Sequence, residues 1–121
     1  MTILHRILGI TVFGASLALA QEPSLTYKEH IFPIIEKHCL RCHLEENDNP
    51  SGLAMDSFEL LMKGGKNGNT VVPGKPEESI LYRKLLSDPP FGKQMPRNRK
   101  KLSAEEIGLI FEWIRQGARK E

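Results

Sequence analysis

Among 121 residues the only cysteines are Cys39 and Cys42, which are separated by two residues, and His43 follows the second directly. If residues 39–43 form one helical turn, these three side chains stand at positions i, i+3 and i+4 and point to one side of it. Two thiols and an imidazole that converge in this way indicate a short set of sites: a disulfide, a redox dithiol, a zinc site or a site of covalent haem attachment.

The rest of the chain weighs against two of these sites. Structural zinc takes four ligands, commonly in two separated pairs, and this chain has no second cysteine pair. Beyond residue 20 its only other histidines are His30 and His38, which lie on the same segment as the motif. A thioredoxin-like dithiol occurs next to a βαβ pattern, and this sequence shows no such pattern. The C-x-x-C-H spacing favours covalent haem attachment, with a plain disulfide as the alternative.

A haem iron bound by His43 needs a second ligand from elsewhere in the chain. Met55 and Met62 lie among apolar residues at nearly helical spacing, so we expect them to pack in the core. Met95 lies in the polar stretch KQMPRN, and a thioether opposite a histidine is a known axial pair that raises the reduction potential. We therefore predict Met95 as the second iron ligand; the alternative is a loop methionine that fills a gap. We also expect the second ring nitrogen of His43 to bind a backbone carbonyl within Pro50–Leu53.

The first 20 residues have the layout of a secretory signal peptide. Arg6 precedes an apolar run from Ile7 to Ala20, which ends in small residues before Gln21. The run is shorter than the roughly 20 residues that a transmembrane helix needs. We predict a signal peptide over residues 1–20 and one exported, periplasmic domain over residues 21–121, without a stable membrane span after cleavage. The alternative is an uncleaved N-terminal anchor.

Charge excludes some classes of partner. Cleavage would remove only Arg6 of the 17 Lys and Arg residues, against 15 Asp and Glu residues, so the mature chain is nearly neutral. This balance predicts neither a nucleic-acid partner nor a membrane-surface partner. One local cluster, which we call the basic collar, surrounds Met95, with no acidic residue from Pro89 to Ala104. It is either a solvated loop or a surface that pairs with haem propionates or an acidic redox partner. Its members are Lys93, Arg97, Arg99, Lys100 and Lys101.

Four segments carry helix-start signals, and none shows the alternation of a strand. Capping residues precede apolar helical patterns at Thr26, at Asp56 or Ser57, and at Ser103, and Pro76 suits a first helical turn. Within the first segment, Pro33 predicts a kink or a restart before the helix reaches the motif. The sequence therefore predicts four short helices joined by long loops.

The chain resembles class I cytochrome c and, within it, the planctomycete-type cytochrome c domain. The resemblance covers roughly Tyr27 to Ala118, in four stretches: IFPIIEKHCLRCH, SGLAMDSFELLMKGG, VVPGKPEESILYRKL and MPRNRKKLSAEEIGLIFEWIRQGA. It implies two helices that cross over one haem, which is held by Cys39 and Cys42 as thioethers and by His43 and Met95 as proximal and distal ligands. The family often reads Met-Pro-Pro where this chain has Met95-Pro96-Arg97, a departure that leaves the ligand in place.

We therefore expect an all-α, cytochrome c-like domain, with about four short helices and long loops wrapped around one haem. The expected function is single-electron transfer through one covalent haem c, with redox proteins as partners and no substrate turnover at the iron. One alternative is a haem-based enzyme subunit or sensor with a labile sixth ligand. The other is a structural or binding module with a disulfide and no haem. Family members of this kind often form part of larger chains, and the resemblance does not imply the functions of such chains for this one.

Overall fold

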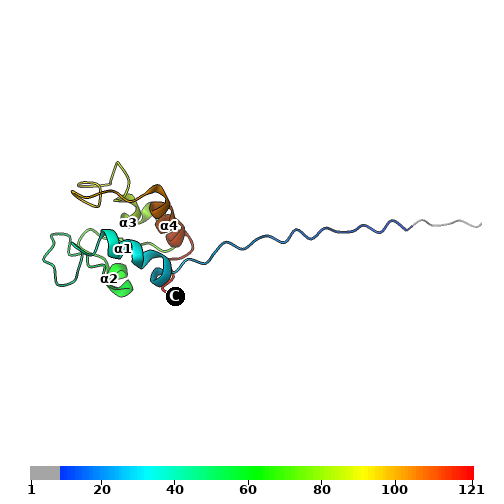
Figure 1. Ribbon diagram of the computed structural model, residues 1–121, viewed down its shortest axis with the longest axis horizontal. Helices are drawn as coiled ribbons and strands as arrows, with labels where there is room; N and C mark the ends of the chain where they lie inside the picture. The colour runs from blue at the N-terminus through cyan, green and yellow to red at the C-terminus, as the bar shows by residue number, and fades with distance from the viewer. Residues whose placement is uncertain (1–8) are drawn as a thin grey trace, which may run out of the picture.

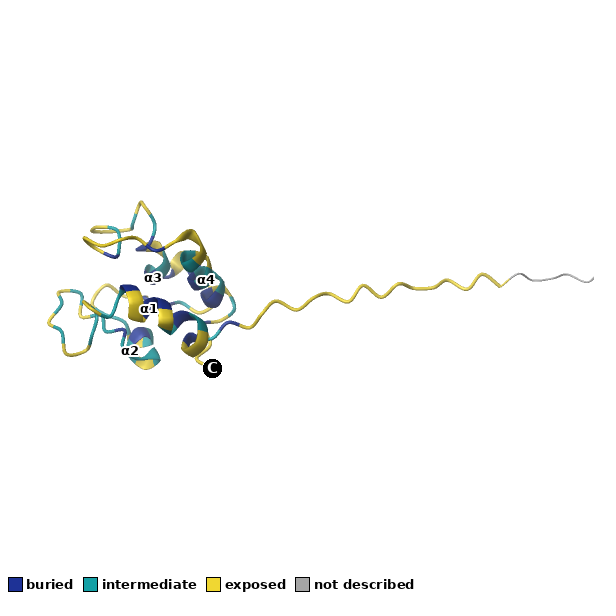
Figure 2. Ribbon diagram, in the orientation of Figure 1, coloured by how far each residue is buried: buried dark blue, intermediate teal, exposed yellow. Residues whose placement is uncertain are grey.

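The computed structural model describes residues 9–121, so the first eight residues of the predicted signal peptide lie outside the described residues. Residues 9–24 are exposed and run without helix away from a body of short helices and loops, as Figure 1 and Figure 2 show. Among the described helices, none combines the length and the apolar character needed to cross a membrane.

All the regular secondary-structure elements within residues 9–121 are helices. The one β-type pairing in this range is an isolated bridge between Gly65 and Gly68. This confirms the predicted all-α class. The elements are, in chain order, the π-helix η1 (Tyr27–Ile31), α1 (Phe32–His38), α2 (Phe58–Lys63), the 3-10 helix η2 (Pro76–Glu78), α3 (Ile80–Arg83) and α4 (Ala104–Arg115).

The first helical segment starts and restarts where the sequence predicts. The hydroxyl of Thr26 accepts a hydrogen bond from the Glu29 N–H at 3.3 Å, which caps η1. Pro33 then lies in the first turn of α1, where its missing N–H costs no intrahelical hydrogen bond. Because α1 ends at His38, this segment delivers the chain directly to Cys39.

The later helices follow their capping signals, with one interruption. Ser57 caps α2, and Ser103 and Glu106 form the predicted capping box of α4. The helix predicted from Pro76 is divided into η2 and α3 at Ser79. The Ser79 hydroxyl donates to the Lys75 carbonyl at 2.9 Å and accepts the Val72 N–H at 2.9 Å, so it ties this residue to the preceding loop. That tie holds Ser79 in an extended conformation and breaks the helix.

The core lies where α4 packs against η1, η2 and α3. Trp113 of α4 is fully buried, and its ring centroid lies 6.1 Å from that of Tyr27, which also stacks edge-on against Phe58 of α2 at 5.5 Å. The N- and C-terminal parts of the domain are further joined by the Tyr27 N–H, which donates to the Arg119 carbonyl at 2.8 Å. Two long loops, residues 41–57 and 88–100, extend from this body toward the same side of the view in Figure 1.

Candidate haem site

Residues 39–43 form a helical turn, the condition on which the interpretation of the motif depends. The His43 N–H donates to the Cys39 carbonyl at 3.0 Å, a helical i+4 to i bond, and the Cys42 N–H donates to the same carbonyl at 3.2 Å. Positions 39, 42 and 43 therefore share one side of the turn. Both thiols are free, with Cys39 half-buried and Cys42 exposed.

The environment of Cys39 differs from that of a reactive dithiol. Burial raises the pKa of Cys39 to about 12; the nearby Arg99 charge opposes this shift and Cys42 adds to it. Reactive dithiols and metal-binding thiolates instead have a lowered pKa.

The imidazole of His43 is fixed in one orientation and one tautomer. Its Nδ1 lies 2.9 Å from the Leu53 carbonyl oxygen, within the range Pro50–Leu53 predicted for this contact. Since a carbonyl oxygen only accepts hydrogen bonds, Nδ1 must carry the proton and donate. In the neutral imidazole this tautomer leaves the lone pair on Nε2, the atom that would bind a haem iron. The His43 backbone is held as well, because its carbonyl accepts the Met55 N–H at 2.7 Å.

Asn49 supports this arrangement and was missed by the sequence reasoning. Its side-chain amide donates to the Leu53 carbonyl at 3.1 Å and to the Cys42 carbonyl at 3.3 Å, so it bridges the motif and the carbonyl that orients His43. Its Oδ1 accepts the Ser51 N–H at 3.1 Å. The available signal was the Asn-Pro-Ser sequence, since asparagine commonly bonds the backbone two residues ahead in a turn.

A glycine lets a second loop lie directly against this turn. The Lys66 N–H donates to the Ser51 carbonyl at 2.8 Å. A Cβ at Gly65 would lie 2.3 Å from that same carbonyl oxygen and 2.9 Å from the Leu53 nitrogen, closer than any side chain allows. Gly65 is therefore required for the close backbone approach that closes the loop around His43.

The burial of Met55 and Met62 is that expected of methionines that pack in the core. Met55 is buried at 2% exposure, and Met62 is half-buried against the core, which agrees with packing roles. Met95 is also half-buried against the core, and its N–H donates to the Lys84 carbonyl at 2.8 Å. The structure therefore places Met95 at a fixed point of its loop; its role as iron ligand stays a prediction.

Half-buried apolar side chains surround the core and form what we call the apolar rim. Such side chains leave part of their apolar surface uncovered, and a flat apolar macrocycle is a suitable cover for it. The rim includes Cys39 of the motif and Met95, a thiol and a thioether of the kinds that hold a haem, and its contact with a haem stays a prediction. Its members are Phe32, Cys39, Leu40, Leu53, Phe58, Met62, Tyr82, Met95, Ile107 and Leu109.

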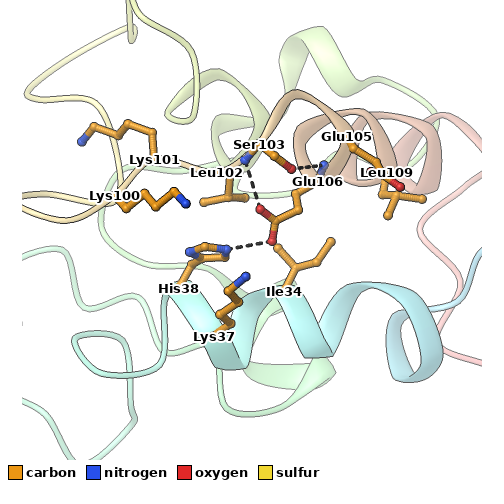
Figure 3. A pocket seen from close by; sticks show the side chains of 10 residues that line it. All are labelled: Ile34, Lys37, His38, Lys100, Lys101, Leu102, Ser103, Glu105, Glu106 and Leu109. Carbon is orange, nitrogen blue, oxygen red and sulfur yellow. Dashed lines mark hydrogen bonds and ion pairs between the residues drawn. The ribbon is translucent and has the colours of Figure 1, made fainter.

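An ion pair beside the motif joins α1 to α4 across a surface hollow, shown in Figure 3. Nε2 of the buried His38 lies 2.7 Å from Oε2 of Glu106. The other carboxylate oxygen accepts the Ser103 N–H at 3.0 Å. The hydrogen bonds from the Ser103 backbone and from His38 lower the pKa of Glu106 to about 2. The hollow also contains Lys37 and Lys100, and it lies next to the haem motif without including its cysteines.

A helical body that presents a C-x-x-C-H turn with an oriented imidazole has the features of a c-type cytochrome domain. Comparison with known families supports that class: residues 39–98 match the family described as planctomycete cytochrome C. The chain is therefore close to this family over the segment that runs from Cys39 past Met95, and the family implies covalent haem c. For η1, α1 and α4, which lie outside the match, the resemblance stays a prediction. Neither the curated proteins nor the solved structures contain a significant match to the chain.

Proposed function

We propose that this protein is an exported carrier of single electrons with one covalently attached haem c. Cys39 and Cys42 form the two thioether links, and His43 and Met95 are the axial ligands of the iron. The observation that carries the proposal is the Leu53 carbonyl bond to Nδ1 of His43, which leaves Nε2 free to ligate at the end of a C-x-x-C-H turn.

The residues around the site suit electron transfer better than substrate turnover. Haem supplies a reversible one-electron change at its iron, and the protein sets the potential of that change. The hydrogen bond from His43 to Leu53 makes the imidazole a stronger donor. A thioether from Met95 favours the reduced iron and so raises the potential. With both axial positions filled by side chains, no position is left for a substrate.

The test is an absorption spectrum, oxidised and reduced, of protein made in a host with cytochrome c maturation machinery. We expect low-spin, six-coordinate haem with the weak red band of a methionine–ferric iron bond. Met95→Ala should abolish that band and lower the potential. Met62→Leu is the matched control, because it removes another half-buried thioether, and it should leave the band unchanged.

Two other outcomes would replace the proposal. High-spin, five-coordinate iron that is insensitive to Met95→Ala would identify a haem enzyme subunit or gas sensor instead. A colourless protein whose cysteines are oxidised to each other would identify a disulfide-containing module without haem.

Export is a separate part of the proposal and rests on the layout of residues 1–20. The mass of the protein isolated from the periplasm or medium should correspond to a chain that begins at Gln21. A full-length mass found only in the membrane fraction would instead identify an uncleaved anchor.

A further inference from the structure

The loop that carries Met95, residues 88–100, has no regular secondary structure, yet its backbone is bound by a buried cation. Lys84, just after α3, is only 8% exposed. Its ammonium donates to the Phe91 carbonyl at 2.6 Å and to the Lys93 carbonyl at 2.7 Å. It also lies 4.7 Å from the centroid of the Phe91 ring. No carboxylate within residues 9–121 forms an ion pair with it, so the loop itself provides the groups that stabilise this charge.

Lys84 also binds Met95 directly through its backbone, since its carbonyl accepts the Met95 N–H at 2.8 Å. The loop is wrapped closely around the ammonium. Gly92 has a φ of +59°, and a Cβ there would lie 3.3 Å from the Lys84 Nζ. Burial lowers the pKa of Lys84, and the Arg97 charge adds to this effect, which is consistent with an ammonium that is shielded from water by the loop.

A second ammonium binds the two residues on either side of Met95. Lys101 donates to the Gln94 carbonyl at 3.1 Å and to the Pro96 carbonyl. Lys100, its neighbour, makes no hydrogen bond or ion pair within the described part of the chain. Figure 3 shows the two ammonium groups pointing in opposite directions, with that of Lys100 directed into the hollow near His38.

We propose that Lys84 and Lys101 are positioning residues, whose ammonium groups clamp the loop backbone on both sides of Met95 and so hold its thioether in place for the iron. This inference rests on the proposed function, because it takes Met95 as a ligand. It separates Lys101 from the rest of the basic collar. Charge-assisted hydrogen bonds to carbonyls are among the stronger ones in proteins, and four of them here act on four residues between Phe91 and Pro96.

The clamps matter because, apart from the Gln94 amide, which donates to the Leu85 carbonyl at 2.8 Å, and the buried Pro96, the loop has few other constraints. Phe91, Gly92 and Lys93 are exposed, so their carbonyls can bind water when a clamp is removed. The loop can then open without unfolding the helices, and Met95 would spend part of its time away from the iron. The expected damage is therefore a weaker iron–methionine bond in a protein that remains folded.

The experiment compares holoprotein variants that differ in a single charge. Lys101→Met and Lys100→Met each remove one lysine ammonium, at neighbouring positions. Lys101→Arg keeps a charged donor at the clamp position. Lys84→Met keeps the buried volume and removes the donor. Three quantities are measured: the intensity of the red methionine–iron band, the reduction potential, and hydrogen exchange of the Met95 amide.

We expect Lys101→Met and Lys84→Met to weaken the band, lower the potential and speed exchange of the Met95 amide at least about tenfold, as for one lost charge-assisted hydrogen bond. Lys100→Met should match the parent protein, and Lys101→Arg should recover most of the loss. If Lys84→Met fails to fold, the Lys101 pair decides the question, because Lys101 is exposed.

Indistinguishable results for Lys101→Met and Lys100→Met would overturn the proposal, since a general charge effect would then explain both. If Met95→Ala itself leaves the band and the potential unchanged, the ligand assignment is wrong. In that case, faster exchange of the Met95 amide in the lysine variants would show that the lysines hold the loop in place although Met95 does not bind the iron.

Discussion

Glu106 ties the first turn of α4 to the end of α1, and we expect its carboxylate to supply much of the stability that is lost in acid. Its two oxygens accept the Ser103 N–H at 3.0 Å and bind Nε2 of His38 at 2.7 Å. These bonds, first that of the Ser103 backbone, lower the pKa of the carboxyl from its ordinary 4.5 to about 2. We therefore choose Glu106→Gln, which keeps the shape of the side chain and removes the charge.

The sign and the size of the effect follow from the lowered pKa. A carboxyl with a lower pKa in the folded state stabilises the fold above its unfolded pKa, and this contribution is lost as the pH falls from about 4.5 toward about 2. The full separation of the two pKa values corresponds to about 3 kcal/mol. Since 21% of the side chain is exposed, solvent screening reduces this, and we expect Glu106→Gln to cost about 1–2 kcal/mol at pH 7.

The assay is guanidinium unfolding of the holoprotein at pH 7 and at pH 3. The parent protein should lose more stability between these two pH values than Glu106→Gln, which should already be weaker at pH 7. Glu105→Gln is the matched control, because it removes a charge from the same helical turn without breaking a hydrogen bond in the described residues. Equal losses in the two variants would refute the reasoning, because the helix dipole alone would then account for both.

Three further results are expected. Asn49→Ala removes one of the two donors on the Leu53 carbonyl, so it should cost about 1 kcal/mol of stability and speed exchange of the proximal imidazole N–H, measured by NMR; unchanged exchange would contradict a role in orientation. Replacing the basic collar, except Lys101, by glutamine should slow electron transfer to an acidic partner at low salt and have less effect at high salt in stopped-flow experiments. A rate indifferent to charge and salt would exclude docking by the collar. A protein with Cys39→Ala and Cys42→Ala, which lacks haem, should show weak helical dichroism, whereas cooperative native-like unfolding would show that the core is complete without haem.

The parts of this structure that sequence reasoning predicted correctly are those determined over a few residues. The start of α4 follows from Ser103 and Glu106, and the restart of α1 follows from the position of Pro33. The turn at Cys39–His43, which the interpretation of the motif assumed, is equally local. Each depends on hydrogen bonds or steric limits between residues no more than about four positions apart. The histidine bond to Leu53 spans ten positions and was predicted from the general need of a ligating imidazole for a second partner.

The supporting residues could not be found in this way, because their partners are chosen by the fold. The ion pair between His38 and Glu106 joins residues 68 positions apart. Lys84 stands beside Leu85 in a helical pattern and reads as an ordinary polar-face lysine, although its ammonium is buried under a loop that begins several residues later. The break at Ser79 likewise depends on Val72, seven positions away. Propensity and periodicity contain no information about such contacts.

The two halves of the proposed site are held by different means, and this difference bears on how the protein responds to stress. The His43 half is held by the bond between His43 Nδ1 and the Leu53 carbonyl and by the hydrogen bonds that the Asn49 amide donates to the Leu53 and Cys42 carbonyls. It directly follows α1, which contributes to the buried core. The Met95 half depends on ammonium groups that hold an otherwise irregular loop. Regions with few buried apolar contacts and exposed backbone open first. Met95 is therefore the part of the proposed site that we expect to be released most easily, while His43 stays with the core.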